Sequence, residues 1–349
     1  MKRGLLTLLL LLIGGAALTR VWHHERPFPE EPRDAFRAAR LQSSARVIFI
    51  TLDGPVRDDV LEGAHMPGLQ AAVRKEGVAL AASASIATAM SLPGYQTMAA
   101  GTLTGCRDND CARIQVETMA ETIARTLHLA PEDVAIFASW SGLALAATSR
   151  DAGVFVDLPS DGPAYEGGPR WGDARFDDET FSAARAHWQA HHPRFMHLSF
   201  LDTDEWAHLG LRPEYEQALR DTDARIMEVL QWVAALPAEE AALTTVLIAS
   251  DHGRGRVDWT RHGLLHPGST EIFVAAIGAL VKRGTPTQVD QRDLRPTVQR
   301  LFGLCPAHVN DDGRAIEAIV GGLPCGDVAG ALVKSGQHRG ASKGLAPIQ

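Results

Sequence analysis

The stretch VIFITLDG, residues 47–54, decides the fold class. Its run of apolar and β-branched side chains is typical of a strand that is buried on both faces, as in a parallel sheet. Similar runs rich in Val, Ile and Phe cover residues 78–82, 134–138, 195–200, 245–249 and 272–277, and helical patterns cover 66–76, 118–127, 179–190 and 213–236. This alternation predicts an α/β fold with a mainly parallel central sheet and helices on both of its faces.

Carboxylates and imidazoles follow three of these strands. Asp53 follows the first strand, whereas Asp251 and His252 follow the run 245–249, and Asp204 and His208 follow the run 195–200. A single Asp at a strand end is more often a helix cap or a turn residue, so the prediction depends on their joint occurrence. Ligands collect beyond the carboxyl ends of parallel strands, and clustered carboxylates are costly to bury unless cations neutralise them. Mixed Asp/His sets of this kind suit zinc or a similar divalent transition metal such as manganese.

A candidate nucleophile lies between Asp53 and Asp204 in the sequence. The segment SLPGY places Ser91 directly before a predicted helix that is opened by Leu92 and Pro93. Serine is a favoured N-cap residue, which is one role for this position. The other role is a hydroxyl at the positive end of the helix dipole, where anionic substrate groups bind and a neighbouring metal would activate it.

The composition indicates a globular protein. The 349 residues carry 34 basic and 42 acidic side chains, for a net charge of −8, which argues against a nucleic-acid partner. A hydrophobic content of 45% with 22% charged residues excludes disorder as the main state. Without an internal repeat, the economical organisation is one domain over residues 45–333, followed by a flexible polar tail, 334–349.

The amino terminus has the pattern of a secretory signal. Lys2 and Arg3 precede an apolar run over residues 5–18, and Ala17 provides a small residue for cleavage. We therefore interpret residues 1–17 as a signal peptide, with an uncleaved membrane anchor as the alternative. Residues 18–44, in which prolines alternate with charges, are then expected to be a tether. The protein is expected to be exported, periplasmic or extracellular, and to contact a membrane only through such an anchor.

Four cysteines fit an exported protein, because an oxidising compartment permits disulfides. Cys106 and Cys111 lie close together, and Cys305 and Cys325 form a second pair near the end of the chain. Two local disulfides are the simplest of the three pairings. Metal ligation is the alternative, although neither pair has the CxxC spacing of a zinc site.

The order of these motifs resembles the alkaline phosphatase superfamily. An Asp after the first strand, a Ser before a helix, DxxxH, DHG and a later His occur in that order between residues 46 and 304. That superfamily includes phosphatases, nucleotide pyrophosphatase/phosphodiesterases, sulfatases and metal-dependent mutases. The resemblance implies two metal ions, one bound by Asp53, Ser91, Asp251 and His252 and the other by Asp204, His208 and His262. His266 is the rival of His262 for the last place.

The same resemblance implies in-line displacement through a covalent seryl ester on Ser91, with two ions clamping the attacking and leaving oxygens. It also implies a donor for the nonbridging oxygen. Phosphodiesterase-type members carry an asparagine beyond the nucleophile's helix, and Asn109 is the candidate here. Arg107 and Arg113 in the same region are the alternatives. These members also carry an asparagine where this chain has Gly94.

Two subgroups of the superfamily fit less well. Sulfatases need arginine in the motif C/S-x-P-x-R, where this chain has Tyr95. The segment between Ser91 and Asp204 is too short to hold the extra domain of a mutase. We therefore expect a hydrolase of small-molecule phosphate mono- or diesters. A sulfuric or phosphonic ester hydrolase with the same ions and an inactive binding relative are the competing readings.

Overall fold

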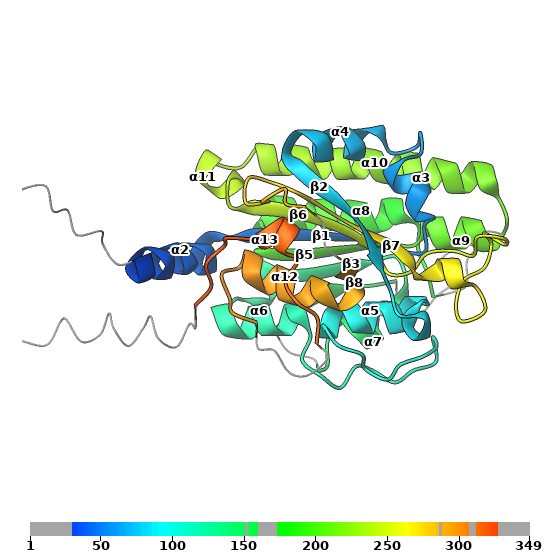
Figure 1. Ribbon diagram of the computed structural model, residues 1–349, viewed down its shortest axis with the longest axis horizontal. Helices are drawn as coiled ribbons and strands as arrows, with labels where there is room; N and C mark the ends of the chain where they lie inside the picture. The colour runs from blue at the N-terminus through cyan, green and yellow to red at the C-terminus, as the bar shows by residue number, and fades with distance from the viewer. Residues whose placement is uncertain (1–29, 151–152, 160–172, 286–287, 307–311, 327–349) are drawn as a thin grey trace, which may run out of the picture.

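The structure is a computed structural model, and it describes residues 30–150, 153–159, 173–285, 288–306 and 312–326. Within these ranges the strands form one eight-stranded sheet in the order β4-β3-β5-β1-β6-β7-β2-β8 (Figure 1). The strands are β1 Arg46–Leu52, β2 Gly77–Ser83, β3 Val134–Ala138, β4 Phe155–Asp157, β5 Phe195–Phe200, β6 Thr244–Ser250, β7 Glu271–Ile277 and β8 Val289–Asp290.

The predicted mainly parallel α/β sheet is confirmed. β1 pairs in parallel with both β5 and β6 at the centre of the sheet. β7 is the exception, because it runs antiparallel to its neighbours β6 and β2. The start of β7 therefore lies at the same edge as the carboxyl ends of β1, β5 and β6.

Helices cover both faces of the sheet, as predicted. They are α2 Glu30–Ser44, α3 Arg57–Leu61, α4 Pro67–Glu76, α5 Ser91–Ala100, α6 Met119–Leu127, α7 Ala144–Ala147, α8 Asp177–His191, α9 Asp202–His208, α10 Arg212–Ala234, α11 Ala238–Ala241, α12 Leu294–Leu301 and α13 Glu317–Val320. Figure 1 shows α4 and α10 over one face and α5, α6 and α12 over the other. None of the helices in the described ranges combines the length and apolar character needed to cross a membrane.

The apolar run over residues 47–52 is buried on both faces of the sheet. Val47 and Phe49 of β1 pack in the core cluster shared with α5, α6 and α12, whereas Ile48 and Ile50 pack in the cluster shared with α8 and α10. Alternate side chains of a strand point to opposite faces, so both faces of β1 require apolar residues. This double burial explains the absence of a polar/apolar alternation in residues 47–52.

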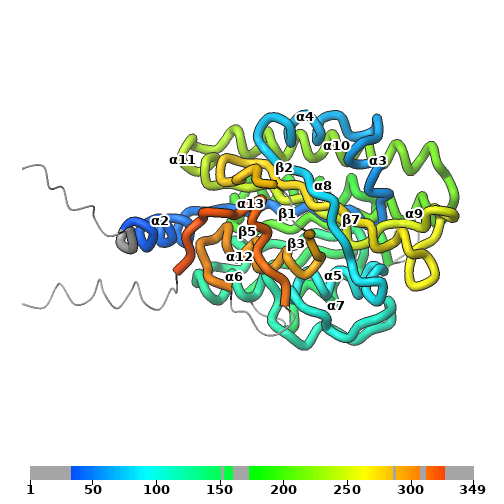
Figure 2. Tube along the Cα trace, viewed as in Figure 1, coloured from blue at the N-terminus to red at the C-terminus, as the bar shows by residue number. Residues whose placement is uncertain are grey.

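The tether expected over residues 18–44 is wrong for residues 30–44, which form helix α2. Ala38 and Leu41 are buried against the domain, and the Gln42 side chain donates hydrogen bonds to the carbonyls of Gly303 and Gly326, at 3.0 and 2.8 Å. Figure 2 shows α2 beside the last described segment. The charges that suggested a solvated linker instead form the outer face of an amphipathic helix. The expected signal peptide, the rest of the tether and the tail 334–349 lie outside the described residues.

Both predicted disulfides are present: Cys106 pairs with Cys111, and Cys305 pairs with Cys325. The first closes a short loop after α5, and the second joins the segments that follow α12 and α13. This pairing supports an oxidising compartment, since such bonds persist mainly in exported proteins.

Candidate metal centre

Three parallel strands and the start of β7 bring the predicted ligand residues to one edge of the sheet. Asp53 follows β1 directly, and Asp251 and His252 follow β6. Beyond β5 the chain turns into α9, which carries Asp204 and His208. His262 belongs to the loop between β6 and β7, and that loop returns to this edge because β7 is antiparallel. Ser91 is the first residue of α5.

The first group of candidate ligands consists of Asp53, Asp251 and His252, which are all buried. Each offers one ligand atom, and these atoms lie within 4.8 Å of one another. His252 Nε2 is 3.2 Å from Asp53 Oδ1 and 3.4 Å from Asp251 Oδ2. His252 Nδ1 lies 2.9 Å from the Gly253 carbonyl, which favours the tautomer that donates there and leaves the Nε2 lone pair toward the carboxylates.

Ser91 joins this first group. Its Oγ donates a hydrogen bond to Asp53 Oδ1 at 3.2 Å and lies 3.3 Å from His252 Nε2. Met90 occupies the N-cap position of α5 and Ser91 is the first helical residue, so the N-cap role considered for Ser91 belongs to its neighbour. The Ser91 hydroxyl is therefore directed at the carboxylates, at the positive end of the helix.

The second group consists of Asp204, His208 and His262, whose ligand atoms also lie within 4.8 Å of one another. Asp204 Oδ2 is 3.2 Å from His208 Nε2, one helical turn away, as the spacing predicted. Asp204 Oδ1 is 3.7 Å from His262 Nε2, and the two imidazole Nε2 atoms are 3.0 Å apart. The rings of His262 and His252 stack with their centroids 3.9 Å apart, so the two groups are adjacent.

The buried atoms of these groups fit metal cations. Asp251 Oδ2 and His262 Nδ1 are buried and have no hydrogen-bond partner within the described ranges. Burial, together with the Asp204 charge, raises the pKa of Asp53 well above its usual range, and burial together with Asp53 does the same to the pKa of Asp251. A divalent ion in each group would relieve this repulsion, and the Asp/His donor sets suit such ions.

Zinc binding to the first group is therefore expected to release protons. Because burial raises the pKa values of Asp53 and Asp251, an incoming ion must displace the protons that these carboxyl groups bind in mildly acidic buffer. Calorimetric titration in two buffers of different ionisation enthalpy measures the number released, and zinc affinity should increase with pH. Zinc uptake without proton release in mildly acidic buffer would contradict this arrangement.

Arg254 is a buried residue of the site that the sequence analysis missed. Its guanidinium donates to the side chain and the backbone carbonyl of Asp204 and to the carbonyls of Gly54 and Thr260. Burial alone raises the pKa of Asp204, but Arg254 and the His208 hydrogen bond outweigh it and hold this pKa well below its usual range. The only sequence signal was a basic residue directly after the motif DHG.

Two glycines explain details of this packing. Gly54 has a φ of +53°, and a Cβ there would lie 2.5 Å from Asp204 Oδ1. At Gly94 a Cβ would lie 2.8 Å from the Asp251 carbonyl oxygen, because α5 passes close to the end of β6. Phosphodiesterase-type members carry an asparagine at the place of Gly94. An asparagine here would require the backbone of α5 to move away from the backbone of Asp251.

An open pocket of about 470 Å³ lies beside the second group. Its lining residues are Met90, Asn109, His208, Thr260, Arg261, His262 and His266. His266, the rival of His262, belongs to the pocket wall and to neither group of candidate ligands in the described part of the chain.

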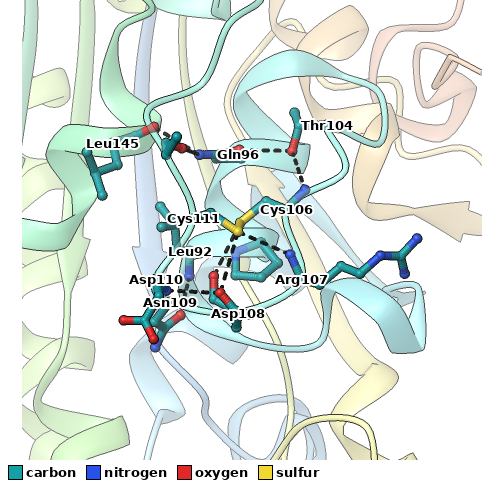
Figure 3. Close-up of a disulfide and its surroundings, with 12 residues drawn as sticks. Leu92, Gln96, Thr104, Cys106, Arg107, Asp108, Asn109, Asp110, Cys111 and Leu145 are labelled. Carbon is teal, nitrogen blue, oxygen red and sulfur yellow. Dashed lines mark hydrogen bonds between the residues drawn. A yellow bond between two sulfur atoms is a disulfide. The ribbon is translucent and has the colours of Figure 1, made fainter.

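Of the three candidate oxyanion donors, Asn109 lines the pocket. Its Oδ1 accepts a hydrogen bond from the Leu92 N–H at 3.0 Å, within the loop closed by Cys106 and Cys111 (Figure 3). Arg113 donates instead to the carbonyls of Ala144 and Thr148, and Arg107 extends away from the disulfide into solvent.

Comparisons with known proteins agree with this architecture. No family model matches the sequence, and no curated protein matches it. Among solved structures, a 2-O GAG sulfatase has a TM-score of 0.59 at 14% identity, with 78% of this chain and 73% of that chain covered.

Two further similar structures are a phosphonate monoester hydrolase and a nucleotide pyrophosphatase/phosphodiesterase. A phosphonate monoester hydrolase of Agrobacterium radiobacter has a TM-score of 0.57 at 15% identity, over 80% of this chain and 78% of that one. Murine ectonucleotide pyrophosphatase/phosphodiesterase 5, an inactive form in complex with AMP, has a TM-score of 0.57 at 13% identity, over 77% and 97%. The sheet order, the ligand geometry and these likenesses lead to one conclusion: the protein has the fold of the alkaline phosphatase superfamily.

Proposed function

We propose that the protein is an exported two-metal hydrolase of phosphate esters that acts through a seryl ester on Ser91. The observation that carries the proposal is the position of Ser91 Oγ, 3.2 Å from Asp53 Oδ1 and 3.3 Å from His252 Nε2, at the start of α5. The hydroxyl therefore faces the buried groups that would hold an ion, and it does not cap α5. Export is supported by the two disulfides and by the signal-like pattern of the first residues.

In the proposed reaction Ser91 Oγ gives up its proton to solvent and forms a bond to phosphorus, while the bond from phosphorus to the leaving oxygen breaks and that oxygen takes up a proton from solvent. Water later attacks the seryl ester, which releases the phosphate product and restores the Ser91 hydroxyl. Divalent ions bound by the two groups would lower the pKa of the Ser91 hydroxyl and offset charge on the attacking and leaving oxygens. The Asp53 carboxylate orients the Ser91 hydroxyl by accepting a hydrogen bond from it. His208, which is partly exposed beside the pocket, lies on the side from which substrate enters.

Asn109 is the proposed donor to a nonbridging oxygen of the substrate. Since its Oδ1 is held by the Leu92 N–H, the two N–H groups of the amide remain to serve the pocket that Asn109 lines. The Leu92 contact also joins the disulfide loop to the nucleophile's helix, so it helps to hold the proposed donor near Ser91.

Replacing Asn109 tests this role. Asn109→Asp keeps an acceptor for the Leu92 N–H but replaces the donor with a negative charge, so kcat/KM should decrease by about 10²-fold with little change in Tm. Asn109→Ala should lose as much activity and also destabilise the helix by about 1 kcal/mol. Asp110→Ala, an exposed neighbour in the same loop, is the control. Unchanged turnover of Asn109→Asp would remove the donor role.

The choice of phosphate over sulfate depends on Ser91 and Tyr95. The arginine required for conversion of the nucleophile to formylglycine is absent, because Tyr95 stands in its place. The likeness to a sulfatase and to a phosphonate monoester hydrolase keeps the sulfuric or phosphonic ester reading as the second candidate. An inactive relative is less well supported, since it would have no chemical need for seven ligand-type residues held together.

Hydrolysis assays on metal-loaded protein separate these readings. The panel consists of aryl phosphate monoester, aryl phosphate diester, aryl phosphonate and aryl sulfate, with zinc or manganese added to the purified protein. We expect phosphate ester hydrolysis that depends on the added ion. Sulfate or phosphonate hydrolysis alone would favour the second candidate. Protein that neither binds metal nor hydrolyses any ester would overturn the proposal.

A further inference from the structure

Tyr95 connects the nucleophile's helix to the first group of candidate ligands. It lies one turn after Ser91 on α5, so both side chains share a helix face, and it is almost fully buried. Its hydroxyl donates to Asp53 Oδ2 at 3.1 Å and accepts a hydrogen bond from Ser199 Oγ of β5 at 3.1 Å. The Ser199 contact occupies an acceptor site of the tyrosine oxygen, which directs the tyrosine's own hydrogen to Asp53.

This contact determines which oxygen of Asp53 remains for an ion. With Oδ2 held by Tyr95, Oδ1 faces both Ser91 Oγ and His252 Nε2, at 3.2 Å in each case. We infer that Tyr95 is a positioning residue that presents the Asp53 carboxylate to a metal ion through Oδ1 alone. The inference rests on the proposed function, because it assigns an ion to the first group. Groups that hydrogen-bond a metal-ligating side chain orient it and support its affinity.

The two groups differ in how their carboxylates are held. Asp204 is held by the charged Arg254, whereas Asp53 is held by a neutral hydroxyl and Asp251 by the N–H groups of Gly54 and His252. A neutral donor adds no formal charge that would compete with a cation for Asp53. An arginine at position 95, as in the sulfatase motif, would place a competing positive charge in this region.

Zinc affinity tests the inference in full-length protein. Tyr95→Phe removes only the hydroxyl, and His208→Ala, at a half-exposed position, weakens the second group so that the first group dominates the titration. In the His208→Ala background, competition with a chromophoric chelator should show zinc binding weakened about 10–100-fold by Tyr95→Phe. Ser199→Ala should weaken it in the same direction by a smaller factor, and it substitutes for Tyr95→Phe if that variant does not fold.

Tyr215→Phe is the matched control. Tyr215 is fully buried and its hydroxyl accepts from the Val56 N–H at 2.9 Å, and it belongs to neither group of candidate ligands in the described residues, so its removal should lower Tm without changing zinc affinity. If Tyr95→Phe and Ser199→Ala bind zinc as tightly as their parent, the positioning role is wrong while the proposed function stands. If the wild-type protein binds neither zinc nor manganese and hydrolyses no ester, the proposed function fails and this inference fails with it.

Discussion

Ser91→Ala is expected to reduce kcat by about 10⁴-fold or more while zinc still binds, because it removes the atom that would form the covalent ester. The fold should persist, since Ser91 Oγ contacts Asp53 and His252 and is not the cap of α5. Turnover on an aryl phosphate ester, zinc stoichiometry and Tm measured on the same preparation separate loss of the nucleophile from loss of the site.

Ser85→Ala is the control for this variant. Ser85 lies on the same connection between β2 and α5, and its hydroxyl accepts from the Ala87 N–H at 3.3 Å, outside both groups of ligands. It should therefore keep wild-type turnover. A Ser91→Ala enzyme that retains substantial kcat would show that water attacks phosphorus directly, and the seryl ester would have to be abandoned. Trapping of phosphate on wild-type protein, absent from Ser91→Ala, provides independent evidence for the covalent step.

Much of this site was predictable because residues that directly follow parallel strands lie at the same edge of the sheet. The apolar runs around residues 47–52, 195–200 and 245–249 became β1, β5 and β6, and parallel strands end at a common edge. Asp53, Asp204 and Asp251 had to converge once that arrangement was accepted. The direction of β7 was not predictable, because an apolar strand has the same composition whichever way it runs. His262 reaches the site through that reversal, and only the motif order had indicated it.

The residues that contact the candidate ligands were harder to predict than the candidate ligands themselves. Arg254 and Tyr95 act through long-range contacts to Asp204 and Asp53, and neither contact follows from local spacing. The glycine at position 94 was recognised as a departure, but its reason is the close approach of α5 to the Asp251 backbone. Helix α2 was missed because a short amphipathic segment rich in charge resembles a solvated linker until its partner surface is known.

Removal of bound metal is expected to abolish turnover and to destabilise the fold. When a chelator removes the ions, the carboxyl groups of Asp53, Asp204 and Asp251 stay buried close together. The guanidinium of Arg254 then pairs with Asp204. At a free ion concentration about 100 times Kd, one site contributes about 2.7 kcal/mol to the free energy of unfolding. Thermal unfolding with and without chelator measures the loss, and added zinc should restore both Tm and activity. Asp251→Asn, which removes one ligand charge, should show a smaller response to chelator than wild type.

The stabilisation of the fold by bound metal should increase with pH, because of the two carboxyl groups of the first group, Asp53 and Asp251. Burial raises the pKa of Asp53 and Asp251 above the values of the unfolded chain. At a pH between the unfolded and the folded pKa, the metal-free folded state therefore binds more protons than the unfolded state. The stabilisation from those protons is complete below the unfolded pKa and is lost as pH rises through the raised, folded pKa. Bound ions keep the carboxylates ionised and remove this loss. The difference in Tm between zinc-loaded and chelated protein should therefore be larger at about pH 8 than at about pH 5. A difference that stays constant or decreases over that range would mean that these two carboxylates are not where the metal binds.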